Sequence, residues 1–243
     1  MTTRRADTGH GPELGRLDDD VVSCSQCPRL VAWRTAVGES PPARFRGDHY
    51  WSRGVPGFGD DDPWLLIVGL APAAHGANRT GRIFTGDRSG DWLYRALHRA
   101  GFANQAESRS RDDGLLLDGA WITCAARCAP PDNKPLPAEL AACEPFLRRE
   151  LDALKQKKVY LALGGIALKA LWPLLRASHE SLPRALPKFA HGAEITLPGD
   201  RLLLMSYHPS QQNTFTGRLT EPMFDAIFTR SKAFLADGGS RLR

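Results

Sequence analysis

The feature that most constrains the fold is a short apolar run at residues 64–70, which reads Trp-Leu-Leu-Ile-Val-Gly-Leu and is stopped by Pro72. An apolar run of this length without polar alternation is typical of a strand buried on both faces of a parallel sheet. Three further short segments, residues 120–123, 158–163 and 202–206, have the same character. We therefore predict four strands in the interior of an α/β protein.

Segments with helical periodicity lie between these strands, at about residues 90–100, 138–155 and 165–176, and a last one lies near 221–236. Strands that alternate with helices indicate a parallel sheet covered by helices on both faces. Residues 1–20 are polar and mixed in charge, so we predict a flexible tail there and one domain over residues 21–243. Residues 39–63, rich in Pro, Gly and Asp, are predicted to form a long loop.

The composition narrows the class of protein without identifying it. Of 243 residues 42% are hydrophobic, which is enough for a packed core, and the net charge of +5 favours phosphate-bearing partners only weakly. No run of about 18 apolar residues and no secretory signal is present. We expect a cytoplasmic protein, in which cysteines stay reduced and serve as metal ligands or isolated thiols rather than disulfides.

Each predicted strand ends in a loop of unusual content. A glycine-containing loop follows the first strand, cysteines follow the second, Gly164 and Gly165 follow the third, and His208 follows the fourth. Ligands of open α/β sheets bind beyond the carboxyl ends of the strands. The sequence therefore predicts one site built from all four loops.

Four of the five cysteines form a candidate metal site. Cys24 and Cys27 form a CxxC motif, and Cys128 and Cys143 can supply the other two thiolates. Four thiolates suit a [4Fe–4S] cluster or a structural zinc ion, and the spacing alone does not choose between them. Cys124 is left over, and its side chain points either toward the site or into the core.

The loop after the first strand, residues 69–87, contains neither of the glycine motifs that bind dinucleotides or nucleoside triphosphates. Phe84 offers an aromatic face on which a base can stack, and Asp87 can orient or deprotonate water. For these residues taken alone a structural interpretation is favoured, with Phe84 in the core and Asp87 capping a helix that begins near Ser89.

The loop after the fourth strand reads HPSQQNTFTG over residues 208–217. His208 can donate a hydrogen bond to an oxygen that becomes negative in a transition state. Gln211, Gln212 and Asn213 offer polar contacts, and Arg218 can meet a phosphate. The alternative is a solvated turn with a structural histidine.

Together these stretches resemble family 5 of the uracil-DNA glycosylase superfamily. The resemblance rests on GLAPAAHGANRTGRIFTGD at 69–87, CSQC at 24–27, CAPPDNKPLPAELAAC at 128–143 and HPSQQNTFTG at 208–217. It implies a three-layer α-β-α sandwich around a four-stranded parallel sheet. It also implies a structural [4Fe–4S] cluster on Cys24, Cys27, Cys128 and Cys143, and no nucleotide cofactor.

The resemblance assigns roles to the candidate site residues. Asp87 would activate water or stabilise the sugar cation, and His208 would stabilise the leaving base. Related families place a catalytic Asp or Asn early in the first motif, where this chain has alanines, and an Asn where this chain has Cys124. The base would lie among Gly69, Ala71, Ala73, Ala74, Phe84, Cys124 and His208.

The implied activity is that of a monofunctional DNA glycosylase, since no lysine is placed for lyase chemistry. It would excise uracil, and also hypoxanthine, ethenocytosine or other damaged bases, from DNA at the start of base excision repair. We expect a monomer that joins the nucleoid when it acts on DNA. The alternative is a non-enzymatic, metal-stabilised DNA-binding module. DNA would be contacted by Arg79, Arg82, Gln211, Gln212, Asn213 and Arg218.

Overall fold

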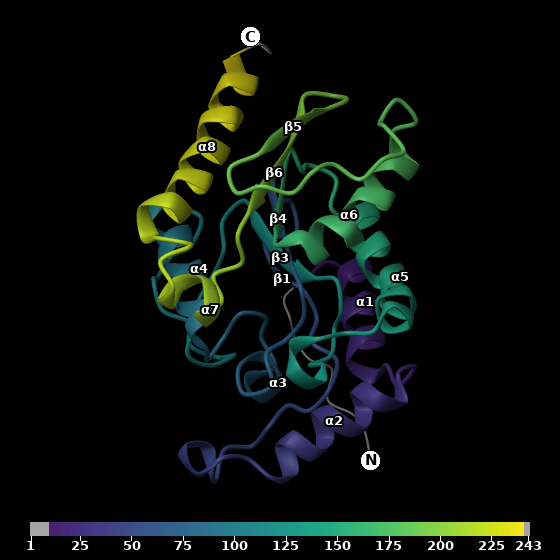
Figure 1. Ribbon diagram of the computed structural model, residues 1–243, viewed down its shortest axis with the longest axis vertical. Helices are drawn as coiled ribbons and strands as arrows, with labels where there is room; N and C mark the ends of the chain where they lie inside the picture. Colours follow the sequence, from purple (N-terminus) through teal and green to yellow (C-terminus); the bar gives the residue numbers. More distant parts are fainter. Residues whose placement is uncertain (1–9, 241–243) are drawn as a thin grey trace.

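The computed structural model describes residues 10–240, and its centre is a six-stranded sheet with the order β1-β3-β2-β4-β6-β5 (Figure 1). The four inner strands are parallel: β3 (Ala120–Cys124), β2 (Leu65–Gly69), β4 (Val159–Leu163) and β6 (Arg201–Ser206). These are the four predicted strands. Two short antiparallel strands, β1 (Phe58–Gly59) and β5 (Glu194–Leu197), lie at the edges and were not predicted.

Helices cover both faces of the sheet (Figure 1). Leu65 and Ile67 of β2 face the core beneath α4 and α8, whereas Leu66 and Val68 face the core beneath α1, α5 and α6. This alternation, buried on both sides, explains the uninterrupted apolar run. The helices are α1 (Pro12–Ser23), α2 (Pro28–Glu39), α3 (Ala77–Thr80), α4 (Arg88–Arg99), α5 (Pro137–Ala153), α6 (Gly165–Ser178), α7 (Gln211–Phe215) and α8 (Glu221–Ser240), with short 3-10 turns η1 (Ala43–Phe45) and η2 (Pro131–Asn133).

The prediction of a flexible tail over residues 1–20 is wrong for residues 12–20, which belong to α1. Leu14, Leu17 and Val21 are buried in the same core as residues of α5. Their spacing of three and four residues is the helical signal that the polar composition of this segment obscured. Residues 1–9 of the predicted tail lie outside the described part of the chain.

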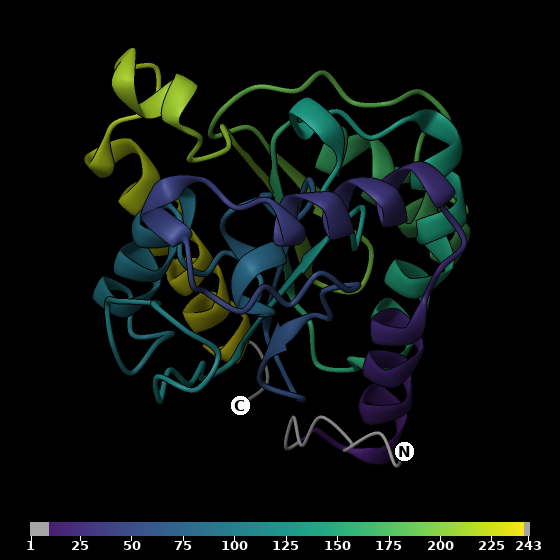
Figure 2. The same ribbon diagram turned by 90° about the horizontal axis from the view of Figure 1, so that it is seen from below.

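The carboxyl ends of the parallel strands point to one end of the molecule, the lower end in Figure 1, where α3 and α7 lie. Figure 2 looks at this end from below and shows α2 crossing it. The predicted convergence of the strand-end loops therefore falls here. Within residues 10–240, no helix combines the length and the apolar character that crossing a membrane requires.

Candidate functional site

A cavity of about 600 Å³ lies at the carboxyl ends of β2 and β6. The loop after β2 contributes residues 70–73, the start of α4 contributes residues 87–89, and the segment at η2 contributes residues 132–134. Phe84 comes from the first motif, and the loop after β6 adds His208 and residues 210–212. The cavity thus joins the loops after β2 and β6 with the segment that follows β3. Gly164 and Gly165, after β4, are not among its lining residues, so three of the four loops predicted to form one site meet here.

Phe84 and His208 form an aromatic pair in this cavity. Their rings are stacked, with centroids 5.5 Å apart and an interplanar angle of 28°. Phe84 is 6% exposed and packs on Gly69, where a Cβ would lie only 2.9 Å from the ring. The two interpretations of Phe84, core residue and pocket residue, therefore both apply.

Burial of the His208 ring lowers its pKa to about 4. The ring is consequently neutral at neutral pH, with one nitrogen as a donor and the other as an acceptor. The chain around it is fixed, because the side-chain amide of Asn213 donates to the His208 carbonyl at 2.8 Å. Asn213 therefore holds this loop through one of its two side-chain N–H bonds.

Asp87 is the N-cap of α4, and its Oδ1 accepts a hydrogen bond from the Gly90 N–H at 3.0 Å. Burial is the main cause of a raised pKa for its carboxyl group. The carboxylate packs against the backbone of Gly76, where a Cβ would lie 2.0 Å from Oδ2. Asp87 thus caps the helix and also lines the cavity, so the two interpretations are combined in one side chain.

The remaining predicted base contacts lie in three places. Ala71 and Ala73 line the cavity with Phe84, whereas Ala74 lines a neighbouring hollow. Gly69 lies behind the Phe84 ring, and so does Cys124, which is 1% exposed and in the hydrophobic core. The structure therefore corrects the prediction that Cys124 contacts the base.

The side chains predicted to contact DNA differ in their exposure and in the hydrogen bonds they already make within the protein. Arg82 is 4% exposed and donates to Thr85 Oγ1, Ser108 Oγ and Asp113 Oδ2 at 3.0, 2.8 and 2.7 Å, so it is engaged inside the protein rather than available to phosphate. Arg79 donates to the carbonyls of His75 and Gly86. Gln211, Gln212 and Arg218 are exposed, with the Arg218 guanidinium 4.4 Å from the centre of the Tyr207 ring.

Sequence reasoning missed the segment at η2. Asp132 and Asn133 have positive φ angles of 53° and 55°, and both line the cavity beside His208 and Gln212. The two prolines that precede them break the chain after the cysteine, and Asp and Asn tolerate this backbone conformation best. Two prolines followed by Asp and Asn were therefore the sequence signal that could have predicted this segment.

Cys24, Cys27, Cys128 and Cys143 line one small cavity, as the sequence predicted. Two sulfurs accept hydrogen bonds, Cys128 Sγ from Arg34 Nη1 at 2.8 Å and Cys143 Sγ from the Arg127 N–H at 3.2 Å. Among residues 10–240, no three His, Cys, Asp or Glu side chains are arranged to hold a single metal ion.

Two buried arginines extend from this cavity into the protein. Arg34 also donates to the Cys24 carbonyl, and its own carbonyl accepts from Asn78 Nδ2 in α3. Arg127 pairs with Glu150 inside the core, where Glu150 also accepts from Thr123 Oγ1 at 2.7 Å and Trp121 Nε1 at 3.3 Å. Neither arginine was a sequence-based candidate, because a single arginine carries no pattern.

The chain is similar to known proteins over most of its length. The family model described as the Uracil DNA glycosylase superfamily matches residues 56–231. The chain is 52% identical over 212 residues to the Type-5 uracil-DNA glycosylase of Thermus thermophilus, covering 87% of this chain and 94% of that protein. It is 50% identical over 225 residues to the Mycobacterium bovis protein of the same name, covering 92% and 82%, and 42% identical over 227 residues to that of Pyrobaculum aerophilum, covering 92% and 95%.

Proposed function

Because the chain belongs to the type-5 uracil-DNA glycosylases of the uracil DNA glycosylase superfamily, we propose that it excises uracil from DNA by hydrolysis of the N-glycosidic bond. The observation that carries this proposal is the cavity at the carboxyl ends of β2 and β6. It brings together a carboxylate, Asp87, and a neutral imidazole, His208, which is stacked on Phe84. These groups match the two charges that the reaction creates.

A base inside a duplex is out of reach, so the nucleotide is flipped into the cavity, which costs a few kcal/mol and least at a mismatch. When the C1′–N bond breaks, its electron pair stays on the base and positive charge remains on the sugar. His208, as a neutral donor, stabilises an oxygen of the departing base. Water then adds to C1′ and gives up a proton, for which the Asp87 carboxylate is the acceptor. The products are a free base and an abasic site.

The mouth of the cavity supports a set of DNA contacts. Gln211 and Gln212 are exposed on α7 and line the cavity, so they are the side chains that we propose fill the gap left in the duplex by the flipped nucleotide. Arg218 is exposed on the segment that follows. Phe215, at the end of α7, is 67% exposed and adds an apolar side chain to this surface. Apolar side chains of this kind insert between base steps in other DNA-binding proteins.

We propose a base range wider than uracil, with hypoxanthine as the first candidate. The support is the burial of Cys124, because a thiol in the core does not read the edge of a base. The cavity volume of about 600 Å³ is also large for a single pyrimidine.

The four cysteines line one cavity, and four thiolates suit a [4Fe–4S] cluster. The N–H donors from Arg34 and Arg127 to sulfur suit thiolate ligands. We propose that Cys24, Cys27, Cys128 and Cys143 hold a [4Fe–4S] cluster, whose iron–thiolate bonds join the α1–α2 junction to α5 and the loop after β3.

Replacement of Cys128 by alanine is expected to remove the cluster, because one of four ligands is lost. Iron and sulfide per chain and the broad visible absorption should fall together, and the thermal unfolding midpoint should drop. Cys124→Ala is the matched control, since this thiol lies outside the cysteine cavity. Purified wild-type protein that contains stoichiometric zinc and no sulfide would contradict the cluster.

The proposed function is tested with matched duplexes that carry one U·G, U·A or hypoxanthine·T pair. Strand scission that appears only after alkali treatment is the expected result, because a monofunctional enzyme leaves an abasic site. We expect the fastest release from U·G, in which unpairing costs least. Folded protein that binds these duplexes and releases no base from any of them would leave the non-enzymatic DNA-binding module as the better account.

A further inference from the structure

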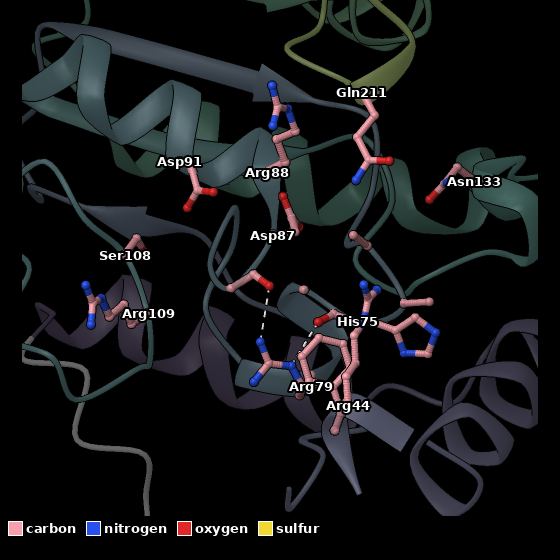
Figure 3. A pocket seen from close by; sticks show the side chains of 15 residues that line it. Arg44, His75, Arg79, Asp87, Arg88, Asp91, Ser108, Arg109, Asn133 and Gln211 are labelled. Carbon is pink, nitrogen blue, oxygen red and sulfur yellow. Dashed lines mark hydrogen bonds between the residues drawn. The ribbon is translucent and has the colours of Figure 1, made fainter. Parts of the chain in front are cut away.

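A second hollow, of about 580 Å³, adjoins the base cavity and is shown in Figure 3. The two hollows share Ala73, Asp87, Arg88, Asn133 and Gln211, so Asp87 stands at the boundary between them. The second hollow is otherwise different in character. Its further lining includes Arg44 and Phe45 of η1 and His75 and Arg79 of the first motif.

The arginines of this hollow are not equivalent. Arg79 pairs with Asp48 at 2.9 Å, and Arg109 pairs with Glu107 at 2.6 Å. Within the described residues 10–240, Arg44 and Arg88 form no ion pair; the Arg44 guanidinium lies 4.8 Å from the centre of the Phe45 ring and that of Arg88 lies 4.3 Å from the centre of the Phe215 ring. In Figure 3, the Arg88 side chain extends upward from beside Asp87, with its guanidinium directed away from the carboxylate, and Arg44 lies below Asp87. The hollow also contains the carboxylates of Asp87 and Asp91.

His75 supplies a neutral polar group to the same hollow. Its Nδ1 lies 2.9 Å from the hydroxyl of Tyr50, which is buried, so Nε2 is the ring nitrogen left for another partner. Burial and the nearby Arg44 and Arg79 lower the pKa of His75, so the ring is uncharged at neutral pH.

We propose that this second hollow binds the phosphodiester next to the excised nucleotide, with Arg44 and Arg88 as its ionic contacts and His75 as a neutral one. The inference rests on the proposed function. If the base occupies the first cavity and its sugar lies at Asp87, the phosphate on that sugar falls on the far side of Asp87. Free guanidinium groups are the side chains best suited to a phosphate. Fixing the phosphate also fixes C1′ relative to the carboxylate.

The test combines protein variants with a neutral substrate linkage. Duplexes with one U·G pair are made with a methylphosphonate at either phosphate that flanks the uridine. For wild type, one of these neutral linkages is expected to raise KM about tenfold, the effect of losing one charge-assisted contact. In Arg44→Gln or Arg88→Gln, KM for the normal duplex is already raised. The same neutral linkage should then raise KM further by less than about twofold. Each variant should also reduce the slope of log KM against log salt by about one.

Arg230→Gln is the matched control, because Arg230 lies on α8, pairs with Glu194 and lines neither hollow. It should keep the wild-type sensitivity to the neutral linkage. The inference is overturned if the neutral linkage still raises KM tenfold in the Arg44 and Arg88 variants, or if these variants keep the wild-type salt slope, while both still release uracil. A wild type that releases no uracil from the unmodified duplex instead contradicts the proposed function.

Discussion

Replacing Asp87 by asparagine is expected to lower kcat for uracil release by about 10² to 10⁴, the range for loss of a positioned acid–base group. KM should change little, because the carboxylate acts on the charge that forms when the bond breaks. Asparagine is as good an N-cap as aspartate, so its Oδ1 can keep the hydrogen bond to the Gly90 N–H that begins α4. Single-turnover release from a U·G duplex measures the effect.

The same variant identifies the group that controls the acid side of the pH profile. Burial raises the pKa of Asp87, so the reactive carboxylate is present above that pKa and is lost as the pH falls through it. Wild-type kcat should therefore decline toward acid with an apparent pKa above the usual value for aspartate of about 3.9. The residual activity of Asp87→Asn should lack this decline.

Asp87→Ala separates the cap from the carboxylate. It should lose about 1 kcal/mol of stability in addition to the loss in kcat, because the cap of α4 is removed. An asparagine variant with at least a tenth of wild-type kcat would show that Asp87 serves the helix and not the reaction.

Replacing Glu150 by alanine is expected to destabilise the fold by about 3 to 5 kcal/mol, because it leaves the Arg127 guanidinium buried without its partner. Glu150 is 1% exposed and Arg127 is 2% exposed. The same change removes the acceptor for Thr123 Oγ1 and Trp121 Nε1. Urea unfolding followed by tryptophan fluorescence measures the loss.

Two further variants show whether charge is the cause. Glu144→Ala breaks an ion pair with Arg148 on the surface of the same helix and should cost less than about 1 kcal/mol. The double variant Arg127→Met with Glu150→Leu removes both charges and should recover most of the lost stability. A single Glu150→Ala variant that is as stable as Glu144→Ala would mean that water reaches Arg127.

The sequence predicted the parallel core of the sheet because β2, β3, β4 and β6 are almost entirely buried and therefore mainly apolar. It did not predict β1 or β5, which have two and four residues and carry exposed or half-buried positions. Such edge strands exist because a neighbour pairs with them, not because of their own pattern.

The site was predictable to the extent that it depends on order along the chain. Strand-end loops converge in any parallel sheet, so Asp87, Phe84 and His208 could be brought together from their positions alone. The direction in which a side chain points could not be predicted in this way. Arg82 and Arg88 are six residues apart in one arginine-containing stretch, yet Arg82 is buried against Asp113 and Arg88 is exposed at the mouth of the cavity.

The contacts of Arg34 connect the cysteine cavity with the loop that contains Asp87. The Arg34 side chain donates hydrogen bonds to Cys128 Sγ and to the Cys24 carbonyl. The Arg34 carbonyl accepts a hydrogen bond from Asn78 of α3, in the loop that leads to Asp87. A disturbance among the cysteines can therefore reach α3, which lies in the same loop as Asp87, through the single residue Arg34.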